Sequence, residues 1–165
     1  MTYRKKSWQE KMMDKNNFPK IQNLKSNFPC YKSMVKMGAR EEDKIVLANP
    51  SEVLEIMNNV PKGRLITIHE ICEKLARKHK VKGCCTLTTG IFIMTIANAA
   101  EEMKREGKES KTPYWRTLKG DGFLNEKFPG GLERHKKLLE REGFTVLSKG
   151  KKYFVKNYEN FIFSG

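Results

Sequence analysis

The chain has 165 residues, a length that suits one domain or one domain with an extension. Its 33 Lys and Arg residues against 19 Asp and Glu give a net charge of +14, which favours a polyanionic partner over a merely charged surface. No stretch approaches the ~18 apolar residues that span a bilayer, and no apolar leader opens the chain, so we expect a cytoplasmic protein without membrane association.

Residues 1–48 form the first predicted region, a basic N-terminal extension. They hold eleven Lys and Arg against five Asp and Glu, with weak apolar periodicity. Ser7 and Glu10 have the spacing of a helix-capping box and predict a short helix. The rest of the region is expected to be an extended arm that drapes over the main domain or is mobile.

Two amphipathic helices are predicted next. The first follows Asn49 or Ser51 as the capping residue and ends before Pro61. The second begins at Thr67, which forms a capping box with Glu70 and is followed by a basic last turn. The apolar face of this second helix comprises Ile68, Ile71, Cys72 and Leu75.

A third helix is predicted over residues 88–105, with Gly107 as its stop signal. Small residues at Ala97, Ala99 and Ala100 make its middle slim. Two helices joined by a short connection are typical of a helix-turn-helix, although a plain three-helix bundle has the same pattern.

The C-terminal part predicts one more helix and a β-hairpin. The segment "GGLERHKKLLEREG" places Leu132, Leu138 and Leu139 on an inward face, and alternating residues flank a turn at Lys149–Gly150. The predicted fold is therefore mainly α with a small β-hairpin. Residues 49–165 would form a winged-helix-like three-helix DNA-binding domain.

The cysteines predict neither a disulfide framework nor a metal site. Cys30, Cys72, Cys84 and Cys85 include no C-x-x-C pair, and adjacent cysteines do not easily bridge each other. Reduced thiols, with no metal and no cofactor, are the simpler expectation.

Three segments, "VPKGRLITIHEICEKLA", "TPYWR" and "GDGFLNEKFPGGLERHKKLLEREG", stand in an order that resembles the DNA-binding domain of the alkylguanine-DNA alkyltransferase family. The resemblance runs from about residue 49 to residue 144. In that family the first segment starts the helix-turn-helix, and the second is a Pro-Cys-His-Arg motif whose cysteine accepts the alkyl group. The third carries a Gly-Gly loop and a helix ending in Glu-Gly. The first 48 residues show no match to the N-terminal domain of full-length members.

The resemblance implies a pocket without its reactive groups. Pro113 and Arg116 match the motif and Glu142 matches its glutamate, but Tyr114 stands at the acceptor cysteine and Trp115 at the histidine. A phenol with a pKa near ~10 is a poor nucleophile at neutral pH. The site therefore has no predicted catalytic residue, and we expect a protein that is not an enzyme.

The family's cysteine-lacking members, the alkyltransferase-like proteins, are the group that this chain is most similar to. They bind DNA, flip an alkylated guanine and hand the lesion to excision repair. The resemblance thus implies a monomer that binds double-stranded DNA, including DNA with O6-alkylguanine, and an excision-repair partner. The chain departs from the family at the base-flipping arginine, whose place falls near Asn98, and at a tyrosine replaced by Ile68.

Two other functions remain open at this point. An active alkyltransferase would use Cys84 or Cys85, because a helix N-terminus lowers a thiol pKa, although buried structural cysteines are the simpler alternative. A winged-helix transcription regulator or general nucleic-acid binder would keep a vestigial pocket. Within that pocket, Tyr114 and Trp115 either fill the old cavity or stack on a base.

The candidate DNA contacts are polar residues of the third predicted helix and basic residues of the second helix and the hairpin. They are Thr88, Thr89 and Asn98; Lys74, Arg77, Lys78, Lys80 and Lys82; and Lys149, Lys151 and Lys152.

Overall fold

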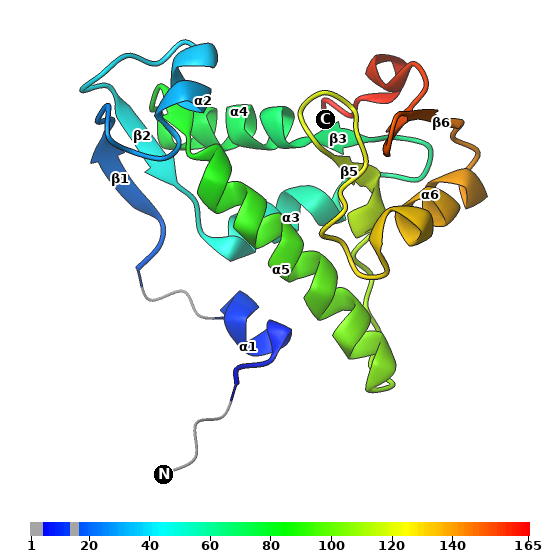
Figure 1. Cartoon of the computed structure of the whole chain (residues 1–165). Helices are drawn as coiled ribbons and strands as arrows, with labels where there is room; N and C mark the ends of the chain where they lie inside the picture. Colours follow the sequence, from blue (N-terminus) through cyan, green and yellow to red (C-terminus); the bar gives the residue numbers. More distant parts are fainter. Residues whose placement is uncertain (1–4, 14–16) are drawn as a thin grey trace.

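The computed structural model describes residues 5–13 and 17–165 (Figure 1). Over these ranges the fold is mixed α/β, with six α-helices and three small sheets, so it contains two small sheets besides the predicted hairpin. The helices are α1 (Trp8–Met13), α2 (Tyr31–Lys36), α3 (Pro50–Asn58), α4 (Ile68–His79), α5 (Thr86–Arg105) and α6 (Gly131–Arg141). Among the described residues, no helix is both long and apolar enough to cross a bilayer.

The first sheet has the order β1-β2-β4 and joins the N-terminal region to the rest of the chain. β1 (Lys20–Asn23) runs antiparallel to β2 (Lys44–Leu47), and β2 runs parallel to β4 (Gly83–Cys84). Residues 17–48 are therefore not an extended arm. Leu24, Met34 and Ile45 are buried there, because they pack with one another and with Cys85 beneath α2.

Local signals set the helix starts as the sequence indicated. The Asn49 side chain accepts a hydrogen bond from Ser51 N at 2.9 Å, so Asn49 caps α3. The capping box of Thr67 and Glu70 starts α4. Ser7 Oγ accepts from Glu10 N at 3.1 Å and caps α1. Each cap satisfies backbone N–H groups that have no partner within the helix.

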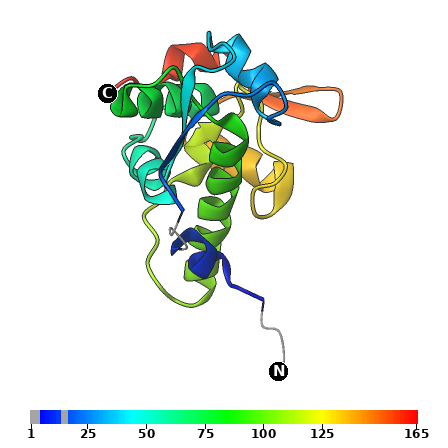
Figure 2. The same cartoon turned by 90° about the vertical axis from the view of Figure 1, so that its left-hand side faces the viewer.

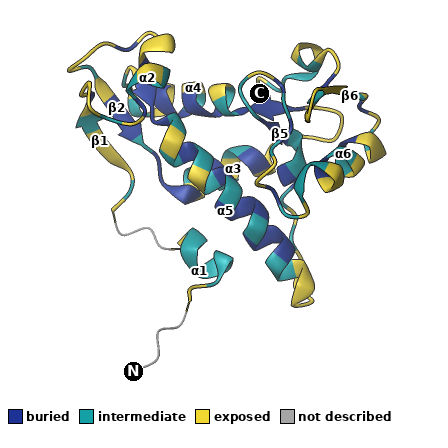
Figure 3. Ribbon diagram, viewed as in Figure 1, coloured by how far each residue is buried: buried dark blue, intermediate teal, exposed yellow. Residues whose placement is uncertain are grey.

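The main hydrophobic core lies between α3, α4 and α5. Val53, Met57, Ile71, Leu75 and Ile96 are almost completely buried there. α3 and α4 cover one side of α5, and α1 packs on its C-terminal half, where Trp8 N and Gln9 N donate to the Glu102 carboxylate (Figure 2). One face of the N-terminal half of α5 stays exposed (Figure 3).

The C-terminal part builds a second core around α6 and the predicted hairpin. β3 (Ile66–Thr67) pairs in parallel with β5 (Thr117–Leu118), and β6 (Val146–Lys149) pairs with β7 (Lys152–Val155). Two short 3-10 helices, η1 (Tyr114–Arg116) and η2 (Tyr158–Phe161), complete this part. Leu139 is buried as predicted, whereas Leu132 and Leu138 are half-buried at the edges of the two cores.

Candidate nucleic-acid interface

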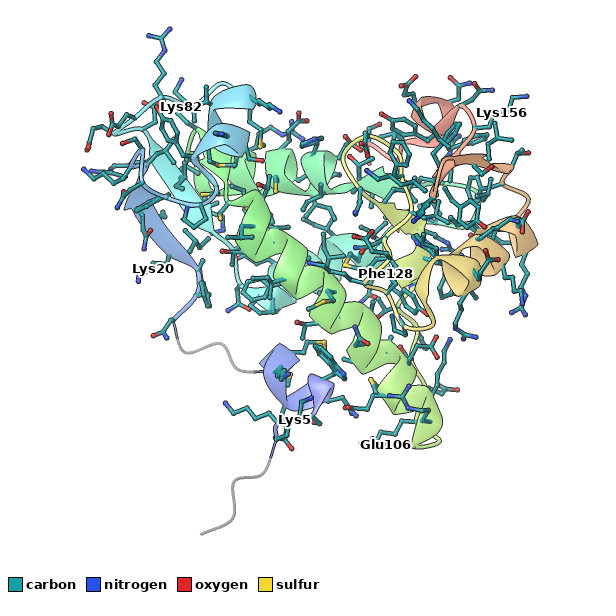
Figure 4. All side chains as sticks on the ribbon, in the orientation of Figure 1. Lys5, Lys20, Lys82, Glu106, Phe128 and Lys156 are labelled. Carbon is teal, nitrogen blue, oxygen red and sulfur yellow. The ribbon has the colours of Figure 1, made fainter. Side chains whose placement is uncertain are left out.

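Tyr114 of η1 packs in the main hydrophobic core. Its side chain is buried with 1% exposure, and its ring meets Phe128 and Trp115 edge to face, with centroids 5.4 Å away in each case (Figure 4 labels Phe128). Its hydroxyl donates to Glu101 Oε1 at 2.7 Å. Burial raises the pKa of the Tyr114 phenol, so the group stays a protonated hydrogen-bond donor.

Glu101 on α5 receives two charge-assisted hydrogen bonds. Besides the phenol of Tyr114, Arg134 Nη2 on α6 donates to Glu101 Oε1 at 3.1 Å. Burial opposes ionisation, but the hydrogen bonds from Tyr114 and Arg134 hold the pKa of the Glu101 carboxyl below its usual value. The network therefore ties η1, α5 and α6 together around the buried Tyr114 side chain.

Glu142 binds the side chains of Trp115 and Arg116, the two residues that follow Tyr114. Trp115 Nε1 donates to Glu142 Oε2 at 2.9 Å, and Arg116 contacts both carboxylate oxygens through Nε and Nη2, at 2.9 and 2.8 Å. Arg116 Nη1 also donates to the carbonyl oxygen of Val60 at 2.7 Å. Arg116 is thus a structural clamp, and the buried Pro113 leads the chain into it.

His135 on α6 is a buried polar residue that the sequence reasoning missed. Its Nδ1 accepts from Asn125 N at 3.1 Å, and its Nε2 donates to the Trp115 carbonyl at 2.8 Å. Burial lowers the pKa of His135 to about 4, so the ring is neutral near pH 7. Both ring nitrogens are engaged, so His135 offers no free base. Its helical spacing between Leu132 and Leu139 is the signal that would have placed it inward.

The polar candidates on α5 are less available than predicted. Thr89 is completely buried and lies 3.4 Å from Cys84 Sγ, so it is not a DNA-contact residue. The half-buried Thr88 hydroxyl donates to Cys85 Sγ at 3.4 Å. Asn98 is half-buried and its Nδ2 donates to the Met94 carbonyl at 2.9 Å. Positions that sequence spacing placed outward are turned inward because α5 is buried on most of its circumference.

The basic candidates fall into two groups at opposite ends of the molecule. Arg77, Lys80 and Lys82 are exposed near the end of α4, while the hairpin lysines lie beside η2, as Lys82 and Lys156 mark in Figure 4. Lys74 donates to the Gly165 carbonyl at 2.6 Å, and Lys78 pairs with Glu52 at 3.5 Å, so both have partners within the chain.

The hairpin lysines are the more accessible group. Lys149, Lys151 and Lys152 are all exposed. The hairpin projects from the side of α5 opposite to α3 and α4, as the turned view in Figure 2 shows.

All four cysteines are free and buried. The hydrogen bond with Cys84 and burial raise the pKa of the Cys72 thiol, and burial raises the pKa of Cys30 to about 12. A buried thiol gives no access to a DNA base. Within the described residues, no group of three His, Cys, Asp or Glu side chains could hold a metal ion.

The fold has known counterparts among solved structures, although no family model and no curated protein matches the sequence. S. pombe ATL in complex with DNA shares 17% identity, with a TM-score of 0.52 over 70% of this chain and 94% of that one. S. pombe Atl1 in complex with damaged DNA containing O6-carboxymethylguanine shares 19% identity, with a TM-score of 0.49 over the same shares. At these identities the similarity is one of fold.

Proposed function

We propose that this chain is a non-catalytic, alkyltransferase-like protein that binds duplex DNA and recognises alkylated or distorted sites for repair. The observation that carries the proposal is the fold shared with S. pombe ATL in complex with DNA, on a chain with a net charge of +14. Nucleic acid is the polyanion that such a surface most often binds. The monomeric state and an excision-repair partner stay predictions.

The chemistry around the motif supports a protein without alkyl-transfer activity. We infer that Tyr114 takes the place of the acceptor thiol, and its phenol is buried and bonded to Glu101. Glu142, which would orient a base, is occupied by Trp115 and Arg116. Alkyl transfer needs a thiolate beside a free base, and this arrangement supplies neither.

The burial of Tyr114 also bears on how a lesion would be recognised. A flipped base needs an empty pocket, and the Tyr114 ring fills this one. We therefore propose that the protein recognises a damaged site by how easily the duplex deforms there, a property that depends on local stacking.

The decisive experiment compares binding to an O6-methylguanine duplex and to the matched undamaged duplex over a range of salt concentrations. Tighter binding to the damaged duplex, with affinity falling as salt rises, is the expected result. Tyr114→Ala should leave the preference intact, because the pocket does not take the base. Mass spectrometry of the same mixtures should show no added methyl group, even for Tyr114→Cys.

Equal, salt-sensitive binding to both duplexes would favour a second function, that of a general duplex binder with a vestigial pocket. The burial of Tyr114 is the observation that supports this alternative. A methyl group attached to the protein without substitutions would contradict both functions.

A further inference from the structure

Two apolar side chains stand out on the open face of α5. Leu87 and Ile91 are each 50% exposed, and their spacing of four residues places them one turn apart on the same helix face. We call this pair the α5 ridge. The half-buried Met94, three residues after Ile91, extends this helix face (Figure 3 shows the exposed bands on α5).

The ridge rises between two hollows. On one side a hollow of ≈ 250 Å³ lies between α4, α5 and the loop 119–127, and on the other a hollow of ≈ 180 Å³ lies against the N-terminal sheet. Leu87 lines both of them. Leu87 therefore has free space on both sides and Ile91 on one, a shape that suits insertion into a partner.

Lysines lie near both hollows, although they line only the first. Lys119, Glu126 and Lys127 line the first hollow, and because Lys119 pairs with Glu126 at 2.7 Å, Lys127 supplies the net positive charge there. No charged residue that the structure describes lines the second hollow, but Gln22 of β1 does, and Lys20 lies on the same face of β1, two residues earlier. An apolar ridge with Lys127 on one side and Lys20 near the other matches duplex DNA, in which phosphates flank a stack of apolar bases.

We propose that Leu87 and Ile91 act as an apolar wedge that enters the minor groove at a weakly stacked base step, partly unstacks it and bends the duplex. This inference rests on the proposed DNA-binding function. Its ligand class is duplex DNA with a flexible pyrimidine–purine step, a mismatch or an alkylated pair, where unstacking costs least. A second copy of the chain fits the ridge poorly, because two molecules of charge +14 repel each other.

The wedge would enter the base stack in place of a side chain at Asn98, the position near which the resemblance puts a base-flipping arginine. Asn98 is half-buried and bonded to the Met94 carbonyl, and Ala97 beside it is completely buried. Neither side chain projects far enough to fill a gap in the base stack. The ridge lies about two to three turns closer to the N-terminus of α5 and does project.

The test uses a duplex with 2-aminopurine at a central TA step, together with end labels that report bending by energy transfer. The intact protein should raise the 2-aminopurine fluorescence several-fold and bring the ends closer. The double variant Leu87→Ala, Ile91→Ala should lose both signals and bind about tenfold more weakly. Alanine favours helix, so α5 should be preserved, and circular dichroism checks this.

Two comparisons make the test specific. Met13→Ala truncates an exposed methionine of α1, away from the ridge, and should leave the fluorescence and bending unchanged. The conservative pair Leu87→Met, Ile91→Leu should keep most of both signals, because it preserves apolar volume. The slope of affinity against salt should be the same in all variants, since the phosphate contacts remain.

Salt-dependent binding without a fluorescence change in the intact protein would overturn the wedge and leave the proposed function standing. An unchanged signal in the double alanine variant would do the same. Light scattering of the same variants tests other partners for the ridge. Self-association, or binding of an acidic protein, that is lost in the double alanine variant would also overturn the wedge. Absence of DNA binding in the intact protein would overturn both proposals.

Discussion

At the scale of single residues, the Tyr114 hydroxyl has a structural task. Glu101 is only 8% exposed, and a carboxylate so placed needs donors that replace water. The phenol of Tyr114 and the guanidinium of Arg134 supply them, at 2.7 and 3.1 Å. Tyr114, which we propose in place of an alkyl acceptor, thus completes a buried hydrogen-bond network.

Removal of this hydroxyl should destabilise the protein without changing its shape. Tyr114→Phe is expected to lower the free energy of unfolding by about 1–3 kcal/mol, because the buried carboxylate then has one donor fewer. Urea unfolding measures the loss. Tyr153→Phe is the matched control, since the Tyr153 hydroxyl donates to the exposed Glu133 and should matter less. Equal losses in both variants would contradict the structural task of Tyr114.

His135 predicts a pH dependence of stability. Its pKa is about 4 in the folded state against an ordinary value of 6.5, so between these values the unfolded chain binds a proton that the folded chain does not. Stability should therefore fall as the pH drops from about 6.5 to 4, by up to about 3 kcal/mol. His135→Gln should be less stable at pH 7 but show a flatter loss over this window in denaturant titrations. An unchanged slope in the variant would assign the effect to other groups.

At the scale of elements, the hairpin should supply phosphate contacts. It projects from the side of α5 opposite to α3 and α4 (Figure 2), whereas Arg77, Lys80 and Lys82 lie at or just beyond the C-terminal end of α4. Substitution of Lys149, Lys151 and Lys152 by Gln should reduce the slope of log affinity against log salt by about 0.9 for each phosphate that is no longer neutralised. Gln variants of the three α4 residues are the matched set and should change the slope less. A larger effect at α4 would move the duplex to that end of the molecule.

The helices and the hairpin could be predicted from sequence because their signals are local. Asn49 and Thr67 cap the helices that follow them, and the turn at Gly150 sets the hairpin. The sheet β1-β2-β4 could not be predicted, since β4 has two residues and pairs with a strand almost 40 positions earlier.

The candidate site also contains residues that the sequence predicted and residues that it did not. The ordered motifs grouped Tyr114, Trp115 and Arg116 with Glu142. In the structure Trp115 and Arg116 contact Glu142, whereas the Tyr114 hydroxyl donates to Glu101. The partners Glu101 and Arg134 were missed, because they lie on two other helices and a contact across helices leaves no spacing signal. The inward turn of Thr89 was missed because the burial of α5 depends on the N-terminal sheet.

At the scale of the whole molecule, residues 17–48 belong to the folded unit. Val46 and Ala48 are completely buried in the main core, and Leu24, Met34 and Ile45 form the core beside it. This packing bears on the boundary expected at residue 48. A cut there would leave β4 without its partner strand and would expose one face of α5.

Deletion of residues 1–48 should therefore prevent stable folding. Each buried Leu, Ile, Val or Met side chain contributes about 1.5–3 kcal/mol, and the sum for the four removed, about 6–12 kcal/mol, falls within the 5–15 kcal/mol that typically stabilises a domain. Circular dichroism with thermal unfolding would show a weak or absent transition. Deletion of residues 1–6 alone, which keeps α1, is the control and should retain the transition. A cooperative transition in the long deletion would restore the boundary at residue 48.

The two-residue strand β4 has a consequence for the dynamics of the protein. Cys84 is buried in the main core and the adjacent Cys85 in the N-terminal core, so one peptide unit belongs to both. Cys85 N donates to the Val46 carbonyl at 2.9 Å, and this bond cannot open without loosening the two cores together. The Cys85 amide should be among the slowest to exchange with deuterium, and at the same rate as the slowest amides of α2 and α5, because the cores open as one cooperative unit.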